Sequence, residues 1–244
     1  MKYDNLIEKR DFVKNNISKL NEILVEKYVL DFDINFAHDS TSIEGNTLTL
    51  RDTKILLEDK RSIGSKDLRE IYEVINHDKA WQYVKKCVDN KEILDEEIVK
   101  RIHKILMENI MEGGVYRSTE VRITGAKHKL PSPLIMKYEL ENFYNLVKNH
   151  ELNDIAIAAY THGEFVKIHP FIHGNGGVSR IIMNYQLINN GFLPISIKSN
   201  DEHGYYDVLE EYAVNNNLNP FIKLICEIEN KELDFYIKAI NASI

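Results

Sequence analysis

The residues best suited to chemistry lie within one short stretch of the second half of the chain. His169 precedes a proline, and a Gly-Asn-Gly-Gly run occupies residues 174–177. Glycines expose backbone N–H groups and let a ligand approach closely, and a helix N-terminus attracts anions. Arg180 would lie about one helical turn further on, where it can meet the same anion. The pattern favours an anion cradle, residues 174–177, beside an imidazole that could act as a general base.

Other interpretations of the same residues stay open at this point. A Gly-rich turn between helices and a structural histidine beside a proline would need no ligand, and no GxxxxGK[ST] motif is present to indicate a P-loop. A metallohydrolase could use His162, Glu164, His169 and His173. That alternative is weak, because no HExxH motif occurs and the Pro and Gly breaks prevent a shared helical face.

Helices must position these residues, because helix formers dominate between only five prolines and eleven glycines. Apolar spacing and cap signals predict helices over 4–30, 35–46, 49–57, 65–90, from 95 onward, 137–149, 153–168, 178–190, 202–215 and 219–240. Residues 115–133 instead combine β-branched and aromatic residues, a glycine, a basic tip and two prolines, which is typical of a β-hairpin flap. The expected fold class is all-α, a helical bundle that carries one small β-hairpin.

Composition narrows the class of protein. The 244 residues include 38 acidic and 31 Lys or Arg side chains, a net charge of −7, which argues against a dedicated nucleic-acid binder. Cys87 and Cys226 are isolated, without zinc-type spacing. The N-terminal residues lack the apolar run of a signal peptide, and no stretch is long and apolar enough for a membrane helix. We therefore expect a cytoplasmic protein with neither nucleic acid nor membrane as a partner.

Several motifs together resemble the Fic family. HPFIHGNGGVSR at 169–180 is similar to the family signature HPFx(D/E)GNGRxxR, and STSIEGN at 40–46 resembles its inhibitory motif (S/T)xxxE(G/N). NTLTLRDTKILLE follows that motif as it does in members with an N-terminal inhibitory helix. VYRSTEVRITGAKHKLP looks like the family's flap, and HGYYDVLEEY resembles the segment that closes over adenine. The similarity spans roughly residues 35–225.

The resemblance implies a protein adenylyltransferase with ATP as substrate. In that reading His169 deprotonates a Ser, Thr or Tyr hydroxyl of a target protein, and Phe171 anchors the loop. The cradle residues Gly174, Asn175 and Gly176 would hold the α- and β-phosphates, and Arg180 the γ-phosphate. The adenine pocket would include Tyr205 and Tyr206. The flap would align a target segment by β-augmentation through Ile123, Thr124, Gly125 and Ala126.

The resemblance also implies autoinhibition and a division of the chain. A helix at about 35–46 would bring Glu44 to Arg180, in the electrostatic position of the γ-phosphate, and Ser40 would steady that helix. Residues 1–90 would form the N-terminal helices including the inhibitory one. Residues 91–225 would form the Fic core, and residues 226–244 a C-terminal helix packed on it.

Two positions depart from the family pattern. His173 stands where the family has an acidic magnesium ligand, and magnesium prefers oxygen, so the identity of any divalent metal, Mg²⁺ or Mn²⁺, stays open. Gly177 stands where the family has its first arginine. These departures motivate an alternative, a nucleotide-sensing regulatory module with little transfer activity. AMP removal, self-modification and a homodimer also stay open, and the residues do not identify the target protein.

Overall fold

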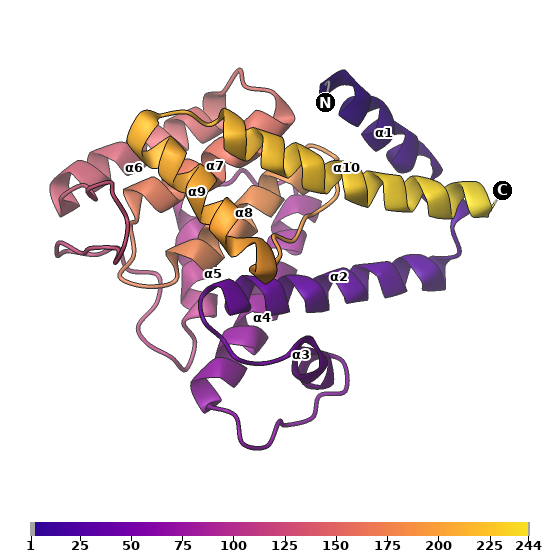
Figure 1. Cartoon of the computed structure of the whole chain (residues 1–244), viewed down its shortest axis with the longest axis horizontal. Helices are drawn as coiled ribbons and strands as arrows, with labels where there is room; N and C mark the ends of the chain where they lie inside the picture. Colours follow the sequence, from indigo (N-terminus) through magenta and orange to yellow (C-terminus); the bar gives the residue numbers. More distant parts are fainter. Residues whose placement is uncertain (1–2, 244) are drawn as a thin grey trace.

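The computed structural model describes residues 3–243, apart from the side chains of residues 200, 202 and 203, as helices joined by loops (Figure 1). The elements are α1 (Tyr3–Asn16), η1 (Ile17–Lys19), α2 (Glu22–Ile43), α3 (Leu50–Leu57), α4 (Leu68–Asp89), α5 (Glu96–Leu106), α6 (Pro133–Asn149), α7 (Asp154–Ile168), α8 (Asn175–Asn189), η2 (Ser199–Asp201), α9 (Glu202–Asn215) and α10 (Asn219–Ala242). The predicted all-α class is confirmed.

Helices α7 and α8 form the centre of the molecule, because they pack along each other and are covered on both sides. On one side, α4, α5 and α6 contribute to a core that contains Trp81, Phe143 and Phe165. On the other side, α1 and α10 contribute to a second core that contains Leu6 and Phe221. Burying side chains on both sides fixes the α7–α8 pair, and this pair determines where the loop between the two helices begins and ends.

The N-terminal third differs from its predicted boundaries. Instead of one helix over 4–30, α1 ends at Asn16 and α2 begins at Glu22, where Asn21 caps it by accepting the Ile23 N–H at 2.9 Å. Apolar periodicity continues across this break, so the pattern alone does not reveal it. Helix α2 then runs through the predicted 35–46 helix and ends at Ile43, and Gly45 has the left-handed φ of 95° expected at a helix stop.

The predicted β-hairpin flap is wrong: within residues 3–243 the structure contains no β-strand. Residues 115–132 form an extended loop with a tight turn, in which the Ala126 N–H reaches the Ile123 carbonyl at 3.3 Å and Gly125 has a φ of 87°. Side chains hold this loop in place of a strand ladder. Arg117 binds carbonyls near its base, and Glu210 accepts from the Lys127 N–H near its tip. We keep the name flap for residues 115–132.

The predicted division at 225/226 falls within α10, which is continuous from Asn219 to Ala242. Helix α10 lies against α1 and contacts α7 and α9, so it joins the N-terminal part of the chain to the centre. In the described part of the chain, none of the helices has both the length and the apolarity to cross a bilayer.

Candidate functional site

The loop between α7 and α8 presents His169 in a constrained conformation. Pro170 disfavours a helical residue before it, and α7 indeed ends at Ile168. His169 then takes left-handed angles, φ 52° and ψ 62°, with its N–H bonded to the Phe165 carbonyl at 3.0 Å. Its own carbonyl accepts from Arg117 Nε at 2.8 Å. Such angles are unfavourable for a side chain with a Cβ, so these backbone contacts are what maintain them.

The loop is braced from inside by Phe171 and Asn175. The Asn175 side chain accepts from the Phe171 N–H and donates to the Phe171 carbonyl, both at 2.9 Å. The Phe171 ring is buried and stacks on the His103 ring at a centroid distance of 3.6 Å. Asn175 can therefore offer a ligand its backbone N–H, but its side chain is already committed.

His103 fixes the loop from α5. The Gly114 N–H donates to His103 Nδ1 at 2.8 Å, so the opposite nitrogen, Nε2, carries the proton and donates to the His173 carbonyl at 3.0 Å. Burial lowers the pKa of His103 to about 4, which keeps the ring neutral at physiological pH. A neutral ring with this tautomer satisfies both contacts.

The anion cradle is formed by the first turn of α8. Gly174, with a φ of 76°, is the N-cap, and no side chain caps the helix. The N–H groups of residues 175–177 donate to none of the described residues, as expected for the first turn of a helix. The left-handed φ favours glycine at 174, and a Cβ there would also lie 2.8 Å from the terminal methyl group of Met107. The free amides and the helix dipole together favour an anion.

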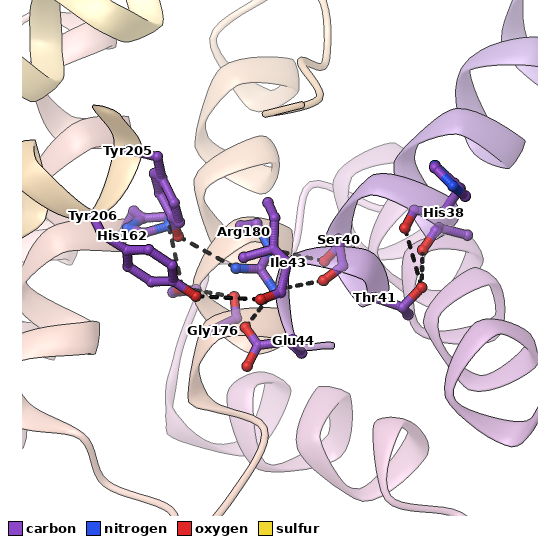
Figure 2. Close-up of polar contacts among 12 residues, drawn as sticks. His38, Ser40, Thr41, Ile43, Glu44, His162, Gly176, Arg180, Tyr205 and Tyr206 are labelled. Carbon is purple, nitrogen blue, oxygen red and sulfur yellow. Dashed lines mark hydrogen bonds and ion pairs between the residues drawn. The ribbon is translucent and has the colours of Figure 1, made fainter. Parts of the chain in front are cut away.

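Arg180 lies one turn into α8 and is 1% exposed. Figure 2 shows its guanidinium between α2 and α9. Arg180 Nε donates to the Ser40 hydroxyl and Nη2 donates to the Ser40 carbonyl, both at 2.8 Å. The carbonyl belongs to the last turn of α2, where helices leave carbonyls unpaired and the dipole favours a cation. Burial acts to lower the pKa of Arg180, but Tyr205 and Glu44 outweigh it and hold the pKa above its ordinary value.

Glu44, the C-cap residue of α2, places its carboxylate in the cradle. Its Oε1 is 2.8 Å from Arg180 Nη2, and a Cβ built on Gly176 would lie 2.1 Å from that same oxygen (Figure 2). The carboxylate is 47% exposed, whereas the guanidinium it meets is buried. The structure thus brings Ser40 and Glu44 to Arg180, and Ser40 contacts the arginine directly as well as belonging to α2.

The two tyrosines at the start of α9 lie differently. Tyr205 is buried, and its hydroxyl lies 3.3 Å from Arg180 Nη1 and 2.8 Å from His162 Nε2. Tyr206 is 47% exposed and donates to the carbonyl of Ile43 at 3.3 Å, at the end of α2. The buried Tyr205 therefore contacts Arg180 directly. The role of both tyrosines in adenine binding stays a prediction.

The flap residues 123–126 are mostly exposed. Lys127 contacts Glu210 of α9 with both its N–H and its ammonium, at 3.1 and 2.6 Å. Ion pairs as exposed as this one contribute little stability. Nothing in the described contacts occupies the flap backbone as a partner strand would, so its target-binding role stays a prediction.

The protonation of His169 suits a base. Burial is the largest influence and lowers its pKa to about 4, while the backbone of Val166 acts in the opposite direction. The ring is therefore neutral and able to accept a proton at neutral pH. His162, which the metallohydrolase alternative would use, is buried against Tyr205 and Ser179. Among residues 3–243, no group of three or more His, Cys, Asp or Glu side chains could hold a metal ion.

Arg117 is a residue of the candidate site that the motifs alone did not single out. It is 2% exposed, and besides the His169 carbonyl it binds the carbonyls of Thr119 and Pro131, at 3.1 and 2.6 Å. Its own N–H donates to the Pro170 carbonyl at 2.9 Å. Arg117 thus ties both ends of the flap to the α7–α8 loop. The one sequence signal was an arginine immediately after the aromatic residue that opens the flap.

The Fic/DOC family model matches residues 93–187. "Protein adenylyltransferase Fic" of Nematostella vectensis is 33% identical over 204 residues, which are 82% of this chain and 48% of that protein. The protein of the same name from Culex quinquefasciatus is 32% identical over 212 residues, 84% of this chain and 42% of that protein. The chain spans less than half the length of these curated relatives.

Solved structures share the fold over the whole chain. A Fic domain-containing signaling protein from Bacteroides thetaiotaomicron is 25% identical with a TM-score of 0.87, and the match covers 98% of this chain and 97% of that one. Residues 134–508 of Fic-1 from C. elegans are 22% identical with a TM-score of 0.88, covering 99% of this chain and 72% of that one. The latter likeness supports the fold alone.

Proposed function

Because the chain contains a domain of the Fic/DOC family, we propose that it is a protein adenylyltransferase that transfers AMP from ATP to a hydroxyl of a target protein or of itself. Relatives about one third identical over most of this chain carry that name. The observation that carries the proposal is the arrangement of the α7–α8 loop: His169 ends α7, and the first turn of α8 that follows has uncapped amides. The charge of Glu44, which pairs with Arg180, acts on His169 as well.

In the proposed reaction the cradle amides and Arg180 hold the phosphates of ATP. His169 accepts the proton of a Ser, Thr or Tyr hydroxyl, whose oxygen attacks the α-phosphorus. The bond from that phosphorus to the bridging oxygen breaks, and pyrophosphate leaves with the electron pair. A neutral imidazole is required for this role, and the low pKa of His169 supplies it. The contact of the His169 carbonyl with Arg117 holds the His169 backbone at the end of α7.

Glu44 is proposed as the inhibitor of this reaction. Its carboxylate is an anion that already lies on Gly176 and Arg180, where a phosphate would be bound. Tyr206 and Asp39 help to keep α2 in place, since Tyr206 donates to the Ile43 carbonyl and Asp39 accepts from Ser196 and Lys198, at 2.8 and 3.0 Å. Productive ATP binding would require the Glu44 side chain to move away.

The residues present do not fit a magnesium ion held by the protein. His173 offers an exposed imidazole nitrogen where a hard cation needs oxygen, and its carbonyl is bonded to His103. We therefore derive no step through a metal. Neutralising the phosphate charge then depends on this chain's own cations, of which Arg180 is the one inside the cradle.

The test is mass spectrometry of the intact protein after incubation with ATP. A mass increase by one AMP unit in a Glu44→Gly variant, abolished by an additional His169→Ala change, would support adenylyl transfer with His169 as the base. ATP binding by His169→Ala, measured by calorimetry, should be nearly unchanged. ATP binding without any AMP adduct on the protein or on lysate proteins would favour the nucleotide-sensing alternative.

A further inference from the structure

Behind the Glu44 carboxylate lies a cavity of about 190 Å³ that opens onto the cradle. Its lining includes Gly174 and Gly177 from the cradle, His77 and Arg69 from α4, and Met107 after α5. A Cβ built on Gly177 would have only Leu106 Cδ1 nearby, at 3.5 Å, so the glycine leaves this space open. The cavity is thus continuous with the anion site, and the absent side chain at 177 enlarges it.

His77 lines this cavity with unsatisfied hydrogen-bonding groups. The residue is 2% exposed, and neither Nδ1 nor Nε2 bonds to any residue of the described chain. Burial lowers the pKa of His77 to about 3, with the charge of Arg180 acting in the same direction, so the ring is neutral with one N–H to donate. Buried polar groups are normally paired, and an unpaired one at a cavity indicates a water molecule or a ligand in that space.

Arg69 supplies the cation at the rim of the cavity. Its Nε donates to Glu73 Oε1 at 3.1 Å, and Glu73 Oε2 in turn accepts from Asn46 at 2.9 Å, which sets the direction of the arginine. Its Nη1 and Nη2 groups donate to no residue within 3–243. A guanidinium that is oriented by its Nε and has both terminal amino groups free can bind two oxygens of a phosphate at once.

We propose that this cavity receives the terminal phosphate of a nucleoside triphosphate, and that Arg69 provides the guanidinium that Gly177 lacks, with His77 as a neutral donor on the inner wall. This inference rests on the proposed function, because it assigns further binding residues to the same site. The cavity's two carboxylates are both paired, Glu44 with Arg180 and Glu73 with Arg69. When Glu44 withdraws, the charged residues of the lining, Arg69 and Glu73, balance each other, and the neighbouring Arg180 is left without its carboxylate.

The test compares ATP and AMP binding by calorimetry in the Glu44→Gly background, where the inhibitory carboxylate is absent. Adding Arg69→Ala should weaken ATP binding about tenfold and leave AMP binding within twofold, because AMP lacks the terminal phosphate. Arg51→Ala is the matched control, because Arg51 is the second residue of α3 and follows a leucine, as Arg69 does in α4. The Arg51→Ala change should alter neither affinity. Unchanged ATP affinity, or equal losses for ATP and AMP, in Arg69→Ala would overturn the assignment.

A rescue variant makes the test independent of folding effects at Arg69. Gly177→Arg, added to the Arg69→Ala protein, places a guanidinium in the same cavity and should recover most of the lost ATP affinity. No recovery in a variant with an unchanged melting temperature would also overturn the assignment. The results distinguish the proposed binding site from the proposed reaction. If ATP binds more tightly than AMP in an Arg69-dependent manner but no AMP adducts form, only the proposed function is refuted. AMP transfer that is indifferent to Arg69 would refute this inference alone.

Discussion

Replacing Glu44 with glycine should raise the rate at which the protein modifies itself with AMP. In the structure, Glu44 Oε1 lies 2.8 Å from Arg180 Nη2 and directly over Gly176, so the carboxylate competes with a phosphate for the same donors. A charge-assisted hydrogen bond contributes about 1.5–3 kcal/mol. Because the Glu44 side chain is 47% exposed, solvent screening reduces this to about 1–2 kcal/mol. Removing the competition should therefore accelerate transfer about 5- to 30-fold.

The assay follows AMP adducts by intact-protein mass spectrometry over time, with saturating ATP and either Mg²⁺ or Mn²⁺. Glu58→Gly is the matched control, because Glu58 is also a helix C-cap glutamate and pairs with Lys54 at 3.3 Å, remote from the cradle. It should leave the rate unchanged. Arg180→Ala in the Glu44→Gly background should cancel the gain. Equal rates for the wild type and Glu44→Gly with both metals would refute the inhibitory role and leave Glu44 as a solvated helix end.

Three further predictions concern the supporting residues. His173→Asp should supply an oxygen ligand and raise magnesium-dependent transfer, and a rate that falls or does not respond to magnesium would contradict this. Arg117→Met should remove the guanidinium donor from four carbonyls, lower the free energy of unfolding in urea by about 3 kcal/mol or more, and slow transfer more than it weakens ATP binding. Burial raises the pKa of Glu229 to about 8. The free energy of unfolding of the wild type therefore falls as pH rises from about 4.5 to 8, where the unfolded chain releases this proton more readily than the folded one. Glu229→Gln, which keeps an acceptor for the Leu193 N–H, should stabilise the protein by roughly 3 kcal/mol at pH 7.5 and hardly at all at pH 4.5, as measured by urea unfolding; an equal effect at both pH values would contradict the titration.

The sequence predicted those parts of the fold that local signals control. Helix α7 ends before Pro170 as expected, and Asp95 caps α5 by accepting the Ile98 N–H at 2.9 Å. Helix α8 begins at Asn175 and not at the predicted residue 178, because Gly174 is its N-cap. The predicted cap at Thr49 is confirmed, since its hydroxyl accepts from the Asp52 N–H. Each of these signals depends on neighbours a few residues apart, which is why a single sequence reveals them.

The sequence did not reveal features that depend on distant parts of the chain. The flap residues have β-forming side chains, yet Arg117 and Glu210 hold the segment, so strand propensity was overridden by tertiary contacts. The break between α1 and α2 leaves the apolar spacing intact and therefore gave no periodic signal. The bracing of the loop by His103 joins residues 70 positions apart, and nothing local to His103 distinguishes it from an ordinary core histidine.

Local spacing likewise predicted one part of the candidate site and did not reveal the other. The spacing of the glycines and Arg180 predicted an anion site at the start of a helix, and the structure has free amides there with a buried guanidinium one turn on. The cavity beside Gly177 could be found only in the structure, because its lining residues Arg69 and His77 come from α4, a helix in which the motifs singled out no residue. Free donor groups on Arg69 and unpaired ring nitrogens on His77 result from how the chain packs, and a sequence pattern does not reveal them.

The most direct test of adenylyl transfer is which phosphate of ATP becomes attached to protein. The Glu44→Gly variant is incubated in parallel with ATP labelled at the α-phosphate and with ATP labelled at the γ-phosphate, and the label on protein is measured after denaturation. We expect the α-label to be incorporated, the γ-label not to be incorporated, and His169→Ala to abolish the incorporation. Incorporation of the γ-label, or of neither label, would contradict adenylyl transfer.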